Sequence, residues 1–297
     1  MLSKKLCMFL SVILILVTVS CTKKEKPKII IGSKNFTEQV LLGEMMSILL
    51  EAKADVQVEH KFNLGGTFIC HNALKGGDID IYAEYTGTAL TAILEKEVIA
   101  EPEKAYETIK KMYLEKFNLV WLKPFGFNNT YTLTMRSDQA EKDGIKSITD
   151  LKKLKDTLIP GFTSEFLERP DGYPALIKHY DFEFKNKVRE MDPGLMYIAM
   201  REKEVDIICG FATDGRIPAF NLVMLEDDKS FFPSYYAAPV VRKEILDKHP
   251  KIAGILNQLN EKIDDVTMAG LNYQVDEKGE KPEEVALQFL KKIGLMQ

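Results

Sequence analysis

The chain has 297 residues, of which 45% are hydrophobic and 28% are charged. This balance supplies apolar material for a sizeable core and excludes both a polytopic membrane protein and a disordered chain. The formal net charge is −4 and the sequence pI is about 5.8, so the chain has no basic footprint of the kind that nucleic-acid-binding proteins carry. Four cysteines are too few for a disulfide scaffold.

Residues 1–20 have the pattern of a signal peptide. Two lysines precede a mostly apolar run over residues 6–19, which is shorter than the roughly 20 residues that span a bilayer. The run ends at Cys21, and Thr18-Val19-Ser20-Cys21 resembles a lipobox, in which the cysteine receives a lipid. Residues 21–27 then form a polar leash. We expect an exported protein that is tethered to a membrane by lipid on Cys21, with a retained membrane helix as the alternative.

From residue 28 onward, short apolar strands alternate with helices. Strands are expected at 28–31, 56–61 and 79–82, separated by helices at 36–52 and 67–75, and Gly76 and Gly77 end the second helix. Another helix begins at about residue 88. Further helices are expected at about 105–117, 147–151, 171–180, 195–203, 244–262 and 282–293, and extended segments at 119–122, 130–135, 205–211 and 240–242. This alternation predicts an α/β fold.

The sequence contains no recognisable catalytic or cofactor-binding motif. None of the four histidines lies in a nucleophile motif, and neither Gly-x-Ser-x-Gly nor a phosphate-binding loop occurs. Cys70 and His71 are adjacent, but no second pair has zinc spacing, so we expect no metal and no cofactor. Cys70 and Cys209 are interpreted as buried free thiols, with a disulfide as the alternative.

Aromatic residues gather where the predicted strands end. These residues are Tyr82, Tyr85, Tyr131, Phe211, Tyr235 and Tyr236. Ligand sites in α/β folds lie outside the carboxyl ends of the strands. Aromatic rings in such a place can surround a quaternary ammonium group, because their π faces attract the cation and the ligand needs no N–H donor. Any one of these tyrosines alone would be interpreted as core or surface, and only their joint placement points to a ligand site.

Several ordered motifs resemble the substrate-binding proteins of quaternary-amine ABC transporters, which bind glycine betaine, choline or carnitine. The motifs lie at 31–39, 80–90, 127–131, 168–172, 211–217 and 225–228, and the resemblance covers residues 28–295. It implies a type II-like periplasmic-binding-protein fold of the α/β class, with two lobes and a ligand cleft between them. Residues 28–127 and 236–297 would form lobe 1, and residues 128–235 would form lobe 2.

The resemblance also implies an aromatic cage. Tyr85, Tyr131 and Tyr235 match cage positions, and Phe211 stands where the family usually has a fourth tyrosine. A phenyl face still attracts a cation, although the lost hydroxyl removes one hydrogen bond and some electron density from the ring. This departure from the family pattern bears on affinity and on ligand choice.

Three further residues match positions that grip the carboxylate of a betaine ligand: Lys34, Thr88 and Arg169. Two cations and a hydroxyl can match one carboxylate, and arginine can do so bidentately. Taken alone, the three would be interpreted as a solvated lysine, a helix-capping threonine and a surface arginine. Asp214 and Arg216 are expected to brace the cleft loop with a local ion pair.

We therefore expect a monomeric, lipid-anchored protein facing the periplasm or the cell exterior. It would capture a quaternary ammonium osmolyte such as glycine betaine and deliver it to an ABC permease, with no catalysis and no nucleic-acid partner. Three alternatives stay open. One is a choline-selective binder, whose ligand has no carboxylate for Lys34 and Arg169. The second is a surface lipoprotein that binds a macromolecule through an extended apolar patch. The third is an exported enzyme, against which the missing catalytic pairs argue.

Overall fold

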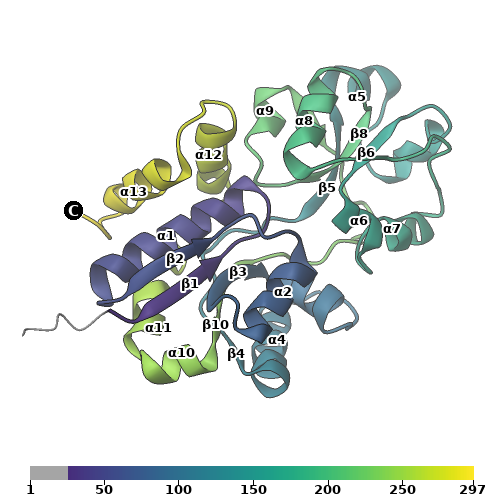
Figure 1. Cartoon of the computed structure of the whole chain (residues 1–297). Helices are drawn as coiled ribbons and strands as arrows, with labels where there is room; N and C mark the ends of the chain where they lie inside the picture. The colour runs from purple at the N-terminus through teal and green to yellow at the C-terminus, as the bar shows by residue number, and fades with distance from the viewer. Residues whose placement is uncertain (1–25) are drawn as a thin grey trace, which may run out of the picture.

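The computed structural model describes residues 26–297, which form two lobes, each built on a mixed five-stranded sheet (Figure 1). The expected signal peptide and the expected lipid site at Cys21 lie outside the described residues. Within 26–297, no helix combines the length and the apolar character needed to cross a membrane.

The first sheet has the strand order β2-β1-β3-β10-β4. Its strands are β1 (Lys28–Gly32), β2 (Gln57–Lys61), β3 (Ile81–Tyr85), β4 (Leu119–Trp121) and β10 (Ala237–Arg242). β1 is parallel to β2 and β3, whereas β10 is antiparallel to both β3 and β4. A late segment of the chain therefore completes a sheet that an early segment begins. We call the part built on this sheet the first lobe.

Helices cover both faces of the first sheet. α1 (Thr37–Lys53) lies on one face beside α11 (Lys251–Leu256), α12 (Asp265–Asp276) and α13 (Pro282–Lys292), and α2 (Thr67–Gly76) and α4 (Pro102–Phe117) cover the other (Figure 1). β1 shows the reason in its sequence: Ile29 and Ile31 pack on the α1 side, and Ile30 between them packs on the opposite side. Such a continuous apolar run is typical of a strand buried on both faces.

The second sheet has the order β7-β6-β8-β5-β9 and takes all its strands from one stretch of sequence, 131–224. Its strands are β5 (Tyr131–Arg136), β6 (Pro160–Phe162), β7 (Arg189–Glu190), β8 (Ile207–Phe211) and β9 (Leu222–Met224). Its helices are α5 (Ser137–Asp143), α6 (Ser164–Glu168), α7 (Tyr173–Tyr180), α8 (Pro193–Arg201) and α9 (Arg216–Ala219). We call this part the second lobe.

Some expected elements differ from the observed ones. The long helix expected at 244–262 is divided into α10 (Lys243–Lys248), α11 and a 3₁₀ turn at Asn257–Leu259. Pro250 explains the division, because proline disfavours a helical conformation in the residue before it, and His249 has φ −131° and ψ 69°. The helix expected from residue 88 starts as α3 (Thr86–Thr88) and continues as a π-helical turn over Ala89–Ile93.

Other elements were not expected at all. No helix was expected at α12, although Asp264 caps it by accepting a hydrogen bond from the Thr267 N–H at 2.7 Å. The helix expected at 147–151 is a 3₁₀ turn at Thr149–Lys153, and the strand β6 that follows it was not expected. The short strands β7 and β9 and the short helices α5, α6 and α9 also lacked a clear period in the sequence.

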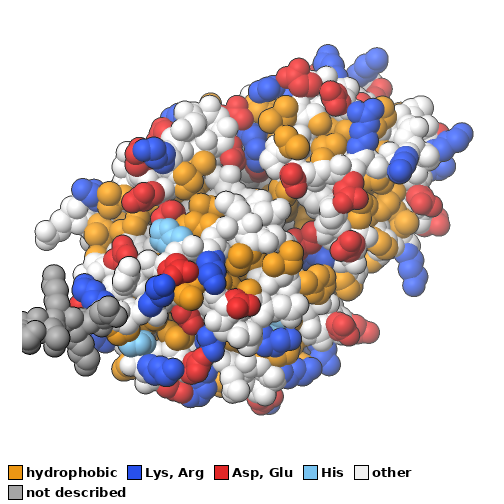
Figure 2. Space-filling model, in the orientation of Figure 1, with side chains coloured by type: hydrophobic (Ala, Val, Ile, Leu, Met, Phe, Trp, Pro, Cys, Tyr) orange, Lys and Arg blue, Asp and Glu red, His pale blue; other side chains and the backbone are white. Residues whose placement is uncertain are grey.

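Cys70 and Cys209 are both buried and free, as expected. Burial raises the pKa of each thiol to about 12, so both stay protonated at neutral pH. The part of the chain that the structure describes contains no cluster of three or more His, Cys, Asp or Glu side chains placed to hold a metal ion. On the face shown in Figure 2, acidic and basic side chains are interspersed rather than separated.

Candidate ligand-binding site

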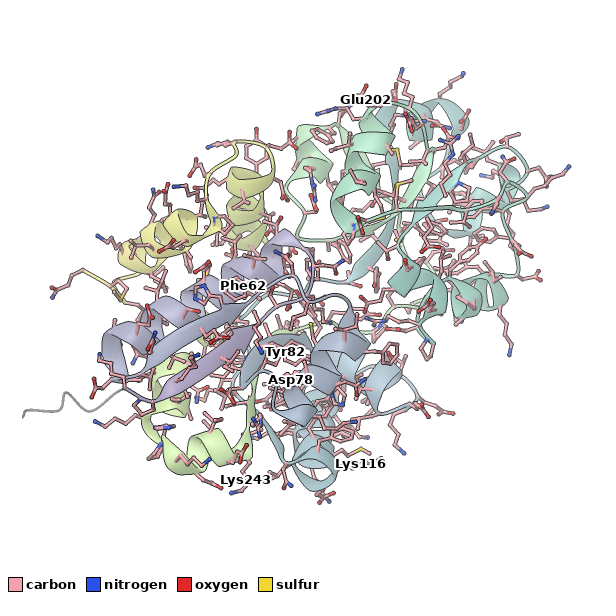
Figure 3. All side chains as sticks on the ribbon, in the orientation of Figure 1. Phe62, Asp78, Tyr82, Lys116, Glu202 and Lys243 are labelled. Atoms are coloured by element: carbon pink, nitrogen blue, oxygen red, sulfur yellow. The ribbon has the colours of Figure 1, made fainter. Side chains whose placement is uncertain are left out.

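A cavity of about 260 Å³ is lined by residues of both lobes. All seven residues expected to bind ligand lie on its wall: Lys34, Tyr85, Thr88, Tyr131, Arg169, Phe211 and Tyr235. Tyr82 and Tyr236, which the sequence also singled out, are not among the lining residues. Tyr82 lies within the first lobe (Figure 3), where its hydroxyl donates to Glu84 at 2.9 Å.

Strand topology explains why the four cage residues meet. Tyr85 is the last residue of β3, and Tyr235 stands two residues before β10, whose first residue pairs with Tyr85. Tyr131 is the first residue of β5 and pairs with Phe211, the last residue of β8. Because each of these strand pairs is antiparallel, the start of one strand and the end of the other lie at the same end of the sheet. In both lobes this end of the sheet faces the cavity.

Three of the four cage rings, those of Tyr131, Phe211 and Tyr235, form a connected cluster. The Tyr131 centroid is 5.4 Å from that of Phe211 and 5.8 Å from that of Tyr235, with the second pair at 89°. A fifth ring, Phe36, stacks on Phe211 with centroids 5.4 Å apart and planes 6° apart, and it lies 6.3 Å from Tyr85. No role in the site was expected for Phe36, although it belongs to the motif at 31–39. Burial raises the pKa of the three tyrosines well above 10, so the rings face the cavity as neutral phenols.

Lys34 is buried, with 2% of its surface exposed, and is not a solvated lysine. Its Nζ donates to Glu84 Oε1 at 2.7 Å and to Thr67 Oγ1 at 2.8 Å, and it lies 5.2 Å from the centroid of the Tyr85 ring. Glu84 is fully buried, so this ion pair is shielded from solvent. The ammonium group therefore already has a protein carboxylate as its partner.

Arg169 is buried as well and is held by several protein groups. Its Nε donates to Asp171 Oδ1 at 2.8 Å, and its two terminal nitrogens reach Glu165 and Thr88, each at 3.0 Å. The guanidinium carbon lies 5.4 Å from the centroid of the Tyr131 ring. Burial raises the pKa of Asp171, but Arg169 outweighs this effect and holds the pKa below its usual 3.8. Tyr235 also donates to Asp171, at 2.7 Å, so the arginine network reaches the cage.

Glu165 connects the two lobes at the edge of the cavity. It lies on α6 of the second lobe, and it accepts hydrogen bonds from the hydroxyl and the backbone N–H of Thr67, the first residue of α2 in the first lobe. Burial raises the pKa of Glu165, but Lys34 and Arg169 together hold it below its usual 4.5. The carboxylate is therefore ionised at neutral pH, beside the residues expected to grip the ligand's own carboxylate.

The sequence predicted two cationic side chains in the site but not the protein carboxylates that pair with them. In the structure, Lys34 and Arg169 face three protein carboxylates, those of Glu84, Glu165 and Asp171. Asp171 lies in the motif at 168–172. Glu165 and Arg169 are four residues apart, which is the spacing of an ion pair on one face of a helix. Asp214 and Arg216 form the expected local ion pair, at 2.6 Å. The arrangement offers ring faces for a cation beside a network of two positive and three negative side chains.

Two lobes around an aromatic-lined cavity define a solute-binding protein. The family model of the substrate binding domain of ABC-type glycine betaine transport systems matches residues 27–292, and the chain belongs to this family. It is thus an extracytoplasmic, non-enzymatic substrate-binding protein of a quaternary-amine ABC transporter. The family resemblance and the two-lobed α/β fold expected from the sequence are both confirmed.

Individual relatives carry names that cover several ligands. The carnitine transport binding protein OpuCC of Listeria monocytogenes is 41% identical over 269 residues, which are 90% of this chain and 87% of that protein. The ergothioneine transport permease/binding protein EgtU of Helicobacter pylori is 40% identical over 273 residues, 92% of this chain and 48% of that protein. A crystal structure described as a glycine betaine/carnitine/choline ABC transporter superposes with a TM-score of 0.74 at 36% identity, covering 91% of this chain and all of that one.

Proposed function

We propose that the chain captures a carboxylated quaternary ammonium osmolyte, glycine betaine or a close relative, and delivers it to an ABC permease. The observation that carries the proposal is that one cavity is lined by five aromatic rings and by Lys34, Thr88 and Arg169. The rings of Tyr85, Tyr131, Phe211 and Tyr235 supply faces for the ammonium group, whose methyl groups need no hydrogen-bond acceptor. The two cations and the hydroxyl supply partners for the carboxylate.

A second candidate ligand is choline, which the charges of the site favour. Lys34 and Arg169 carry two positive charges, and Glu84, Glu165 and Asp171 carry three negative ones. A ligand with one positive charge would balance this set. A zwitterionic ligand would leave one negative charge in excess, and its carboxylate would compete with Glu165 for Thr67 and Arg169.

Calorimetric titration separates the two candidates. Glycine betaine, carnitine and choline are compared with 3,3-dimethylbutanol, a neutral isostere of choline that has the same shape but no charge. Our proposal expects glycine betaine or carnitine to bind at least tenfold more tightly than choline, and the neutral isostere to bind far more weakly than choline. Tighter choline binding would support the second candidate. If none of the charged ligands raises the melting temperature at millimolar concentration, both are wrong.

We also propose lobe boundaries at residues 127/128 and 235/236. The support is that β4 and β10 belong to the first sheet, whereas β5 and β9 belong to the second, so both crossings fall inside 122–130 and 225–236. The chain would act as a monomer that closes around its ligand by rotation about these two crossings. Small-angle scattering with and without ligand tests this, since closure reduces the radius of gyration.

For the N-terminus we propose lipidation at Cys21. The support is the basic start and the apolar run that end at this residue. Replacing Cys21 by Ala should release the mature protein from the membrane fraction. A variant that stays membrane-bound with residues 1–20 still attached would show that the apolar run is a retained helix.

A further inference from the structure

A buried carboxylate lies behind the cage and takes no part in the site as described so far. Glu38, in the first turn of α1, is 2% exposed and accepts four hydrogen bonds from side chains. The Tyr85 hydroxyl donates to Oε1 at 2.7 Å, and Asn129 Nδ2 donates to the same oxygen at 2.8 Å. The Thr213 hydroxyl donates to Oε2, and so does Asn272 Nδ2, at 3.3 Å.

These four donors come from four separate parts of the molecule. Tyr85 is a cage residue at the end of β3, and Asn129 lies in the segment that crosses from β4 to β5. Thr213 stands in the second lobe, two residues after Phe211, and Asn272 lies on α12. The donors also bind one another, because the Thr213 N–H donates to Asn129 Oδ1 at 3.4 Å and Asn272 Nδ2 donates to the Thr213 carbonyl at 2.9 Å.

One carboxylate thus contacts a cage ring, a crossing segment and the second lobe at the same time. We propose that Glu38 is a positioning residue that couples the aromatic cage to the placement of the two lobes. It holds the Tyr85 ring through its hydroxyl, and it holds the loop that follows Phe211 through Thr213. This inference rests on the proposed function, since it takes Tyr85 and Phe211 to be faces for a quaternary ammonium ligand.

The donor set explains why this position needs a carboxylate. Burial raises the pKa of Glu38, and the hydrogen bonds from Thr213, Tyr85, Asn129 and Asn272 oppose this rise. The geometry matches the ionised form, because an ionised carboxylate has four acceptor sites on two oxygens, which equals the number of donors around Glu38. A glutamine in either orientation would turn its NH₂ group toward an asparagine NH₂, because Asn129 is on one side and Asn272 is on the other. A hydroxyl can rotate to accept, but an amide NH₂ cannot. Asn272 cannot simply flip either, because its Nδ2 is also bound to the Thr213 carbonyl.

The coupling is tested with Glu38→Gln, and Glu51→Gln, on the exposed side of the same helix, is the matched control. Tyr85→Phe removes only the hydroxyl and keeps the ring face. Affinity for glycine betaine and choline is measured by calorimetry. Lobe separation is measured between spin labels on cysteines introduced at Lys116 and Glu202, which are exposed and lie at opposite ends of the molecule (Figure 3).

We expect Glu38→Gln and Tyr85→Phe each to weaken both ligands at least tenfold, and the double variant to be little worse than either alone, since both remove the same contact. Glu38→Gln should also broaden the distribution of label distances with and without ligand. If Glu38→Gln fails to fold, Thr213→Val removes one donor and carries the same expectation. The inference would be overturned if the affinity losses of the two single variants were fully additive in the double variant. It would also be overturned if Glu38→Gln gave the same distribution of label distances as Glu51→Gln. Wild-type protein that binds neither ligand would refute the proposed function instead, and the ligand-free distances would still test the coupling.

Discussion

Replacing Glu165 by Gln should change the affinities for glycine betaine and for choline in opposite directions. Glu165 lines the cavity, and it occupies Thr67 and Arg169 with its own carboxylate. The glutamine has the same shape and still accepts a hydrogen bond, so the change removes a charge and little else. Glycine betaine should bind more tightly because its carboxylate no longer faces a like charge. Choline should bind more weakly because its cation loses the attraction of the Glu165 carboxylate.

The magnitude follows from Coulomb's law. Two unit charges about 6 Å apart interact by about 3 kcal/mol at an effective dielectric constant of about 20. Arg169 contacts Glu165 at 3.0 Å and offsets part of its field at the ligand. We therefore expect a change of about 1–2 kcal/mol for each ligand, or about 5- to 30-fold in Kd. The ratio of the two dissociation constants should change by the product of both effects.

The assay is calorimetric titration of both ligands at pH 7, where Glu165 is ionised because Lys34 and Arg169 lower its pKa. Glu168→Gln is the matched control, because Glu168 is exposed and lies on the same helix, α6. The control should leave both dissociation constants unchanged. Shifts of the same sign for both ligands, or no shift, would show that Glu165 does not act on the ligand through its charge.

Three further predictions concern stability and the cage. Burial raises the pKa of Glu44 to about 7, and Glu283 adds to the rise; a carboxyl whose pKa is raised by folding destabilises the protein as pH increases from about 4.5 to above 7. Glu44→Gln should therefore raise the free energy of unfolding by about 1 kcal/mol at pH 8 and hardly at pH 5, as measured by urea denaturation; an equal gain at both values would contradict this. Gly87→Ala should weaken every quaternary ligand about tenfold in calorimetry, because the new methyl would lie 2.8 Å from the Tyr235 ring; unchanged affinity would mean that this ring does not touch ligand. Phe211→Tyr should tighten quaternary ligands about two- to fivefold through a more electron-rich ring, with a melting temperature within about 2 °C of wild type; a large loss of stability at unchanged affinity would place Phe211 in the core instead.

Strand ends predicted where aromatic residues would gather, and the family resemblance selected the expected cage residues among them. Tyr85, Tyr131 and Phe211 each follow or open an apolar run, and the carboxyl ends of strands are where α/β folds bind ligands. Phe36 was missed because it precedes a helix, where an aromatic residue is ordinarily interpreted as core. Its stacking on Phe211 joins residues 175 positions apart, and no local spacing shows such a contact.

The carboxylates around Lys34 and Arg169 show a second limit. Glu165 could be paired with Arg169 from helical spacing, but its contact with Thr67 crosses between lobes and joins positions 98 residues apart. α12 was missed for a different reason. Its apolar residues do not share one face, since Met268 and Leu271 are buried whereas Val266 is 82% exposed. Hydrophobic periodicity finds a helix only when burial follows the period.

The return of β10 into the first sheet has a consequence for the order in which the chain folds. The second sheet is complete once residue 224 has been made, whereas the first sheet lacks its fourth strand until residue 242. β4 is an edge strand that pairs with β10, so it has no neighbour before β10 arrives. The second lobe can therefore nucleate from its own contiguous segment, and the first lobe must close a loop of more than a hundred residues, which is the slower step. The only tryptophan, Trp121, lies on β4 and pairs with Val240. Its fluorescence during refolding would report this late closure and not the earlier folding of the second lobe.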